Sequence, residues 1–253
     1  MRDKQLTLYH GTNHEIPRPE YGEGKQNNDY GRGFYCTQNF EKAAAWAMRD
    51  ISSPIVNEYS LDAGELKVFN FAELKTNILL HWAAVVIHNR SFKLGQQIEI
   101  NNYNFLEKFF YIDLSNYDII KGYRADDRYF RYAKDFLRNS ITIAELGNAM
   151  FAGNLGTQTV LTSQRAFSQI SFIKSHLITK RDKFESYDSI ARKTAEEYEQ
   201  MQKRKLASEL SPSSVPMVLS NIVFLHNAKP DTDFDNFANR GKHEPSIRFL
   251  FSE

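Results

Sequence analysis

Two stretches near the start of the chain decide the fold: Leu8-Tyr9-His10-Gly11-Thr12 and Asp29-Tyr30-Gly31-Arg32-Gly33-Phe34-Tyr35-Cys36-Thr37. Each places an imidazole or a phenol beside glycine in a run that otherwise has strand composition. Glycine lets a backbone N–H and C=O approach a ligand with no Cβ in the way. Neither stretch matches a phosphate loop or a dinucleotide-binding fingerprint, because the required Lys-Ser/Thr pair or third glycine does not follow. The two stretches therefore predict a nucleotide site of another type.

These stretches resemble the first two signature motifs of the ADP-ribosyltransferase superfamily, in its diphtheria-toxin and poly(ADP-ribose)-polymerase branch. That branch carries a His-Gly-Ser/Thr strand, a Gly-x-Gly-apolar-Tyr strand and a third strand bearing Glu or a substitute. We interpret residues 167–172 as the third element, with Gln169 where most relatives have Glu. The chain from residue 6 to about 180 also resembles a small bacterial branch of the superfamily, through residues 29–35, 42–47, 56–59, 89–90 and 125–127.

The resemblance implies an α+β fold with a split antiparallel β core, flanking helices and an NAD cleft between two sheets. It implies that His10 bonds the adenosine ribose, that the Gly11 backbone holds the carboxamide and that Tyr35 packs on the nicotinamide ring. Trp46 is a second candidate wall for that ring. The complete set of expected site residues is His10, Tyr35 and Gln169 as catalytic groups and Tyr9, Gly11, Thr12, Gly33, Phe34 and Trp46 as NAD-binding groups.

Cleavage of the bond between nicotinamide and ribose passes through an oxocarbenium-like state, for which positioning and electrostatics can supply most of the catalysis. We expect NAD as a co-substrate and no metal. Gln169 can donate and accept hydrogen bonds but cannot act as a base at neutral pH. This favours a single transfer to an acceptor over chain elongation.

The sequence thus predicts an NAD-dependent mono-ADP-ribosyltransferase, and the resemblance implies an intracellular bacterial toxin of the toxin–antitoxin or phage-defence type with a neutralising partner. Two alternatives remain open. One is an NAD glycohydrolase that depletes the cofactor, and the other is an inactive module that binds ADP-ribose or a partner protein.

The acceptor is expected to be RNA or DNA rather than protein, although protein is possible. Four arginines repeat at helical spacing: Arg124, Arg128, Arg131 and Arg138. They form either a solvated helix face or a surface that contacts nucleic-acid phosphates, with Arg124, Arg128 and Arg131 as the candidate acceptor-binding residues.

The whole chain has the composition of a globular protein, with 42% hydrophobic and 25% charged residues and a net charge of +1. That charge gives no global attraction to nucleic acid or membrane. No run approaches the roughly 18 apolar residues of a membrane span, and the first residues lack a secretory signal. The single cysteine, Cys36, excludes an intrachain disulfide, suits a reducing cytoplasm and is interpreted as a small buried residue.

Strands are expected at residues 6–9, 33–37, 55–61, 66–69, 117–120, 160–162 and 168–173, with 55–61 and 66–69 forming a hairpin and the last two forming another pair. Helices are expected after the N-cap Asn39 and at 71–89, 125–138 and 143–151. We predict one domain over residues 1–253, with a charged helical arm at about 179–210 and C-terminal strands within 220–253 that extend the main sheet.

Overall fold

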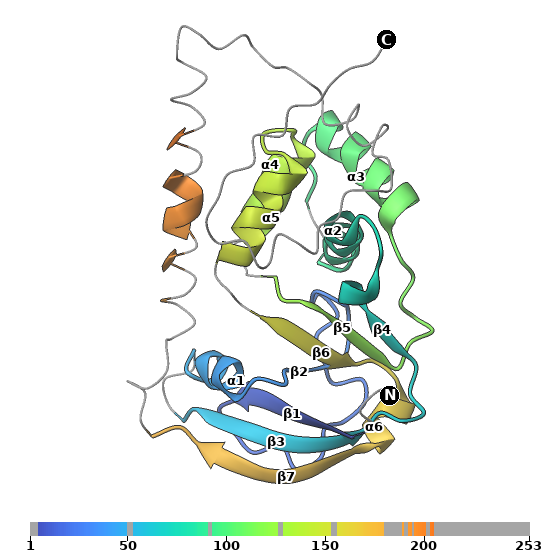
Figure 1. The fold of residues 1–253 in the computed structure, drawn as a ribbon, viewed down its shortest axis with the longest axis vertical. Coiled ribbons are helices and arrows are strands. Elements are labelled where there is room, and N and C mark those ends of the chain that lie inside the picture. The colour runs from blue at the N-terminus through green and yellow to red at the C-terminus, as the bar shows by residue number, and fades with distance from the viewer. Residues whose placement is uncertain are drawn as a thin grey trace, which may run out of the picture.

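The structure, a computed structural model, describes residues 5–49, 53–90, 93–125, 129–152 and 156–179, together with 189, 192–193, 195–200 and 203–204. The described residues form a mixed α+β protein with two sheets and a layer of helices, as predicted (Figure 1). The predicted C-terminal strands and most of the predicted arm lie outside the described residues.

The first sheet contains β1 (Gln5–Thr12), β3 (Ile55–Asp62) and β7 (Ile170–Leu177) in the order β1-β3-β7, and both pairs are antiparallel. Leu6 and Leu8 of β1 are buried, whereas Thr7 between them is exposed, which is the alternation of a strand with one face in the core. An apolar cluster that includes Leu8, Tyr59 and Leu61 packs between this sheet and the second one.

The second sheet has the order β2-β6-β5-β4, with β2 at Phe34–Cys36, β6 at Thr157–Leu161, β5 at Ile119–Tyr123 and β4 at Val68–Asn70. Its pairs are antiparallel except for β4 and β5, which run parallel. The two sheets meet where Tyr9 of β1 bridges Thr37, which follows β2, through reciprocal backbone hydrogen bonds of 2.8 and 2.9 Å. The sheets therefore join along the strands that carry the two motifs.

The helix α1 (Phe40–Ala47) begins at Asn39, whose side chain accepts a hydrogen bond from the Lys42 N–H, as predicted. It lies close to β1 because Ala43 and Ala47 have small side chains and because Gly11 has no Cβ. A Cβ at Gly11 would overlap the Ala43 carbonyl oxygen. Cys36 is buried, as predicted.

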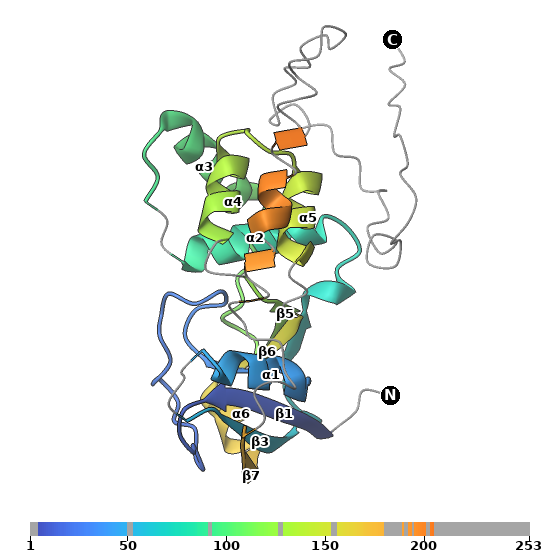
Figure 2. The ribbon, with the colours of Figure 1, turned by 90° about the vertical axis from the view of Figure 1, so that its left-hand side faces the viewer.

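The remaining helices are η1 (Phe71–Glu73), α2 (Ile78–Asn89), α3 (Gln97–Phe110), α4 (Tyr129–Leu137), α5 (Ile143–Ala152) and the short α6 (Gln164–Ser168). The helices α2, α3, α4 and α5 gather at one end of the molecule, on the far side of the second sheet from β1, in both views (Figures 1 and 2). The largest apolar cluster lies there, around the fully buried Trp82 of α2.

The described part of the arm packs on this helical layer. Tyr198 is buried, its ring lies 4.1 Å from that of Tyr132 on α4, and its hydroxyl donates to Asp135 at 2.7 Å. The arm therefore has at least one internal docking contact.

Two predicted strand pairs are wrong. Residues 55–61 and 66–69 do not form a hairpin, because β3 belongs to the first sheet and β4 pairs with β5 in the second. Likewise β6 and β7 lie in different sheets. The predicted helix at 71–89 is divided into η1 and α2, and α3 was not predicted.

Candidate functional site

His10 lies at the junction of the two sheets and is held by β2. Its Nδ1 is 2.7 Å from the Tyr35 carbonyl oxygen, and its ring stacks on Phe34 at 4.6 Å between centroids. A carbonyl oxygen only accepts hydrogen bonds, so Nδ1 carries the proton and Nε2 is an acceptor in the neutral ring. Burial lowers the pKa of His10 below its usual value of 6.5, although the bond to Tyr35 opposes the shift. The imidazole is therefore neutral at pH 7, with Nε2 able to accept a hydrogen bond from a hydroxyl group.

The Tyr35 ring is fixed by its own hydroxyl. That hydroxyl donates to the Gly31 carbonyl at 2.7 Å and accepts from the Tyr30 N–H at 3.0 Å. The turn that provides both groups needs Gly31, whose φ is +75°. Burial raises the pKa of Tyr35 far above the physiological range. Tyr35 can therefore offer a ring surface to a ligand but cannot exchange a proton with it.

The three NAD-binding residues predicted on β1 differ in position. Tyr9 packs its ring edge-on against Phe40 of α1, on the opposite side of the strand from His10, so the structure does not bring it into the site. Gly11 has its N–H and C=O on the same strand edge as those of Tyr9, which bond Thr37. Thr12 ends the strand, with its hydroxyl 3.4 Å from His14 Nδ1.

Gly33 serves packing rather than ligand approach. A Cβ there would lie 2.6 Å from the Leu161 carbonyl oxygen and 2.7 Å from Val160 Cγ1, so β6 can pair with β2 only because residue 33 is glycine. Phe34, in contrast, is part of the site because it supports the His10 ring.

Gln169 is not brought together with His10 and Tyr35, contrary to the sequence-based expectation. It lies just before β7, where its carbonyl accepts from the Asp62 N–H. The position on β7 level with His10 is Ser175, because His10 pairs with Asn57 and Asn57 pairs with Ser175. Six residues of strand separate the two levels, roughly 20 Å at the usual rise.

The strand that neighbours β2 is β6, and it places a different glutamine at the site. Tyr35 pairs with Val160 and Cys36 with Thr159, so Gln158 is the next residue along. Gln158 is buried, and its Nε2 is 2.7 Å from Asp29 Oδ2 and 3.3 Å from the Tyr123 carbonyl oxygen. The sequence contained a signal for Gln158, because the strand that follows Gly156 is mostly buried and carries one amide side chain.

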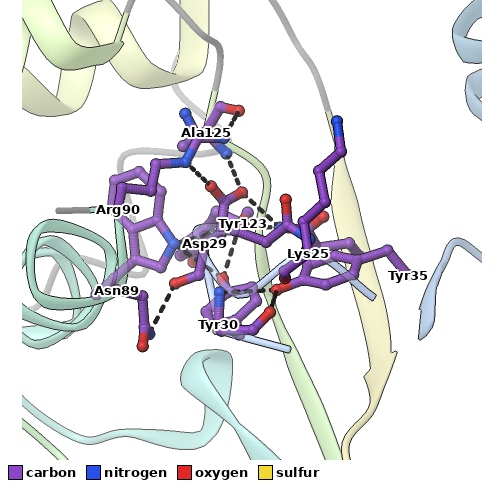
Figure 3. Close-up of polar contacts among 12 residues, drawn as sticks. Lys25, Asp29, Tyr30, Tyr35, Asn89, Arg90, Tyr123 and Ala125 are labelled. Atoms are coloured by element: carbon purple, nitrogen blue, oxygen red, sulfur yellow. Dashed lines mark hydrogen bonds and ion pairs between the residues drawn. The ribbon is translucent and has the colours of Figure 1, made fainter. Parts of the chain in front are cut away.

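Asp29 is the centre of a buried polar cluster between β2, β5, β6 and α2 (Figure 3). Its carboxylate forms an ion pair with Arg90 at 2.5 Å and accepts from the Ala125 N–H at 3.0 Å, while its backbone carbonyl accepts from Asn89. Burial raises the pKa of Asp29, and the Arg90 guanidinium opposes that rise. Residues 29, 89–90 and 125, which come from three stretches singled out in the sequence, thus meet at one carboxylate.

The predicted arginine surface is divided. The Arg124 guanidinium lies 3.7 Å from the centre of the Trp46 ring, and Arg49 lies 4.5 Å from it. The charge of Arg124 also lowers the pKa of His10, which places Arg124 and its neighbour Trp46 near the imidazole. Arg131 lies 5.7 Å from the Tyr198 ring, and Arg138 pairs with the buried Glu99 of α3. Arg128 lies outside the described residues. The three described arginines of the predicted set therefore contact three different partners.

A family model described as "Protein of unknown function (DUF3990)" matches residues 6–172. The chain belongs to the DUF3990 family. The comparisons with curated proteins and with solved structures gave no match. The DUF3990 match contains His10, Asp29, Tyr35, Arg90, Arg124 and Gln158. Within the described part of this DUF3990 chain, no cluster of His, Cys, Asp and Glu is suited to a metal ion, and no helix has the length and apolar character to cross a bilayer.

Proposed function

We propose that this chain is an NAD-dependent mono-ADP-ribosyltransferase. The observation that carries the proposal is the hydrogen bond between the His10 imidazole and the Tyr35 backbone, because it places the two motif side chains on adjacent strands at the junction of the sheets. The two-sheet core with flanking helices is compatible with the fold that the resemblance implies.

The residues at this junction suit NAD. His10 Nε2 can accept a hydrogen bond from a ribose hydroxyl, and the Gly11 backbone lies on the edge where a carboxamide can pair with it. The Tyr35 ring is the stacking surface for the nicotinamide ring. Trp46 with its two arginines provides a positively charged aromatic surface nearby.

The chemistry needs one bond broken and one formed. The bond between ribose C1′ and the nicotinamide nitrogen breaks, the leaving nicotinamide takes the electron pair, and the acceptor's nucleophile attaches to C1′. Gln158, the polar residue on the strand beside β2, replaces Gln169 as the third-strand residue in this proposal. An amide can bond the ribose but cannot remove a proton, so the acceptor must be a good nucleophile or be activated by another group.

We keep a nucleic acid, RNA or DNA, as the favoured acceptor because Trp46, Arg49 and Arg124 combine a stacking surface with cations. The proposal includes the role that the resemblance implies, a cytoplasmic toxin of the toxin–antitoxin or phage-defence type with a neutralising protein partner.

The test is to incubate the protein with NAD labelled in the adenylate part and to separate the RNA, DNA and protein pools. We expect label in one pool with the native chain and with Asp118→Asn, whose buried carboxylate bonds Lys67 and Ser163 away from the site. His10→Ala and Tyr35→Ala should remove the label. Transfer that survives both changes would refute the site, and nicotinamide release without label in any pool would identify a glycohydrolase.

A further inference from the structure

Asp29 and Gln158 form a buried pair although 129 residues separate them in the chain. Asp29 is 3% exposed and Gln158 is 8% exposed, so neither side chain exchanges its partner for water easily. A buried polar group without a hydrogen-bond partner destabilises the folded protein. The orientation of each of these side chains is therefore set by the groups to which it bonds.

The partners fix the orientation of the Gln158 amide. Its nitrogen lies 2.7 Å from Asp29 Oδ2 and 3.3 Å from the Tyr123 carbonyl, and both of these oxygens are acceptors. Chemistry alone thus assigns the NH₂ group to this side, because the reversed amide would set oxygen against two acceptors. Both N–H groups are directed to protein, which leaves Gln158 Oε1 as the group that a substrate hydroxyl can use.

Asp29 is committed to protein groups on every side. Oδ1 pairs with Arg90, and Oδ2 accepts from the Ala125 N–H and from Gln158. Moving to a ligand would cost this buried carboxylate its ion pair and its hydrogen bonds. Its influence on a substrate must therefore pass through Gln158.

We infer that Asp29 is a positioning residue that orients the Gln158 amide, so that this site carries its carboxylate on residue 29 rather than on β6. The inference rests on the proposed function for the identity of the substrate, which is the ribose of NAD. It also accounts for a glutamine at 158. A glutamate there would put two carboxylates within hydrogen-bonding distance, and one of them would have to bind a proton.

The pair can be tested by removing each member alone and both together. Asp29→Leu removes the acceptor that orients the Gln158 amide, and Gln158→Leu removes the amide itself. Asp29→Asn is the conservative variant, because its amide oxygen can still accept from the Ala125 N–H and from Gln158 while Arg90 loses its charged partner. The Tyr123 carbonyl keeps its donors Tyr30 and Trp82 when the Gln158 donor is removed.

The first arm of the test is thermal unfolding without ligand. We expect Asp29→Leu to lower the melting temperature by roughly 10 °C, because it leaves the largely buried Arg90 charge without its partner, and Gln158→Leu to lower it by less. The double variant should lose less than the sum of the two single losses, because the hydrogen bond between the two residues is lost only once. A double variant that melts at the temperature given by adding the two single losses would overturn the pairing.

The second arm measures nicotinamide release from NAD. Asp29→Leu should lower kcat about 100-fold, with a smaller change in KM, because the Gln158 amide no longer holds the ribose in the reactive geometry, and Asp29→Asn should rescue most of this loss. The double variant Asp29→Leu/Gln158→Leu should have the same kcat as Gln158→Leu, because Asp29 acts through Gln158. Asp118→Asn, which also removes a buried carboxylate beside the second sheet, should keep the native kcat. An unchanged kcat in Asp29→Leu, or a double variant that is slower than Gln158→Leu, would overturn the positioning role.

The two arms separate the failure of this inference from the failure of the proposed function. A native chain that releases no nicotinamide would refute the NAD chemistry and the role of Asp29 in it, while the unfolding cycle would still decide whether residues 29 and 158 are paired.

Discussion

The two motif side chains depend on backbone groups rather than on each other. His10 bonds the carbonyl of residue 35, and the Tyr35 hydroxyl bonds the turn at residues 30–31. Because strand pairing and a turn position these backbone groups, a change in one ring leaves the anchor of the other in place. The identity of each ring can therefore be tested separately.

Tyr35→Phe and Tyr35→Ala should differ in their effect on NAD turnover. The hydroxyl is buried and its pKa is raised beyond the working range, so Phe removes only an orienting contact. We expect Tyr35→Phe to lose about 1 kcal/mol of unfolding free energy and less than about 5-fold in kcat/KM. Tyr35→Ala removes the stacking surface and should lose about 10- to 100-fold in kcat/KM. Equal losses in steady-state assays of the two variants would show that the hydroxyl takes part in the reaction.

His10 should make the folded protein less stable in mild acid. Burial lowers its folded pKa below the usual 6.5, so the unfolded chain binds the proton first as the pH falls. The stability that the neutral ring contributes is complete above pH 6.5 and is lost as the pH falls toward the folded pKa, by up to about 1.4 kcal/mol per pH unit. Urea unfolding at about pH 7.5 and about pH 5.5, on either side of the ordinary histidine pKa, measures this loss.

The matched control for that measurement is His10→Gln, which can still donate to the Tyr35 carbonyl but does not titrate. It should lose less stability on acidification than the native chain. If the native chain and His10→Gln lose the same unfolding free energy on acidification, His10 is not a buried neutral imidazole.

At the scale of single elements, the position of α1 on β1 depends on Gly11. A methyl group at Gly11 would overlap the Ala43 carbonyl and lie 2.9 Å from the Ala47 nitrogen, so the helix would have to move away from the strand. We expect Gly11→Ala to cost about 3 kcal/mol of unfolding free energy in urea titrations. Gly22→Ala is the control: its φ is +96° but no atom lies within 4 Å of the added group, so it should cost only about 1 kcal/mol. Equal costs would show that α1 does not rest on Gly11.

Local patterns predicted elements better than pairings. The strand at 33–37, the capped helix after Asn39 and the helix at 143–151 were predictable because alternation, capping and helical periodicity are local properties. The predicted hairpin around Asp62-Ala63-Gly64 is wrong, because contacts distant in sequence decide which sheet each strand joins. The helix α3 was missed since its Asn-rich sequence looks like a loop, and the buried Glu99 at its start compensates.

The same limit explains the candidate site. Four of the expected site residues stand in short motifs that can be read directly, and the structure gathers them: His10, Phe34, Tyr35 and Trp46. Gln169 and Gln158 are both glutamines in or beside a strand, and the pairing of β6 with β2 decides which of them lies beside Tyr35. Asp29 has no local signal of its role, because its partners Arg90, Ala125 and Gln158 come from three remote segments.

At the scale of the whole molecule, the polar cluster at Asp29 links the sheets to the helical layer. Arg90 extends from the end of α2, and the Trp82 nitrogen donates to the Tyr30 hydroxyl and the Tyr123 carbonyl. The site is therefore built from both layers, and a ligand bound at it should stabilise them together.

This coupling predicts the effect of a non-cleavable NAD analogue on thermal unfolding. At about 100 times its dissociation constant, a ligand that binds only the folded state adds about 2.7 kcal/mol, or roughly 5–10 °C for a chain of this size. We expect the native chain and Asp118→Asn to show one transition that moves by this amount in calorimetry. His10→Ala and Tyr35→Ala should show a much smaller shift. If the native chain unfolds in two steps and the ligand moves only one of them, Asp29 does not couple the sheets to the helices, because a shared cluster would make both layers unfold with the site.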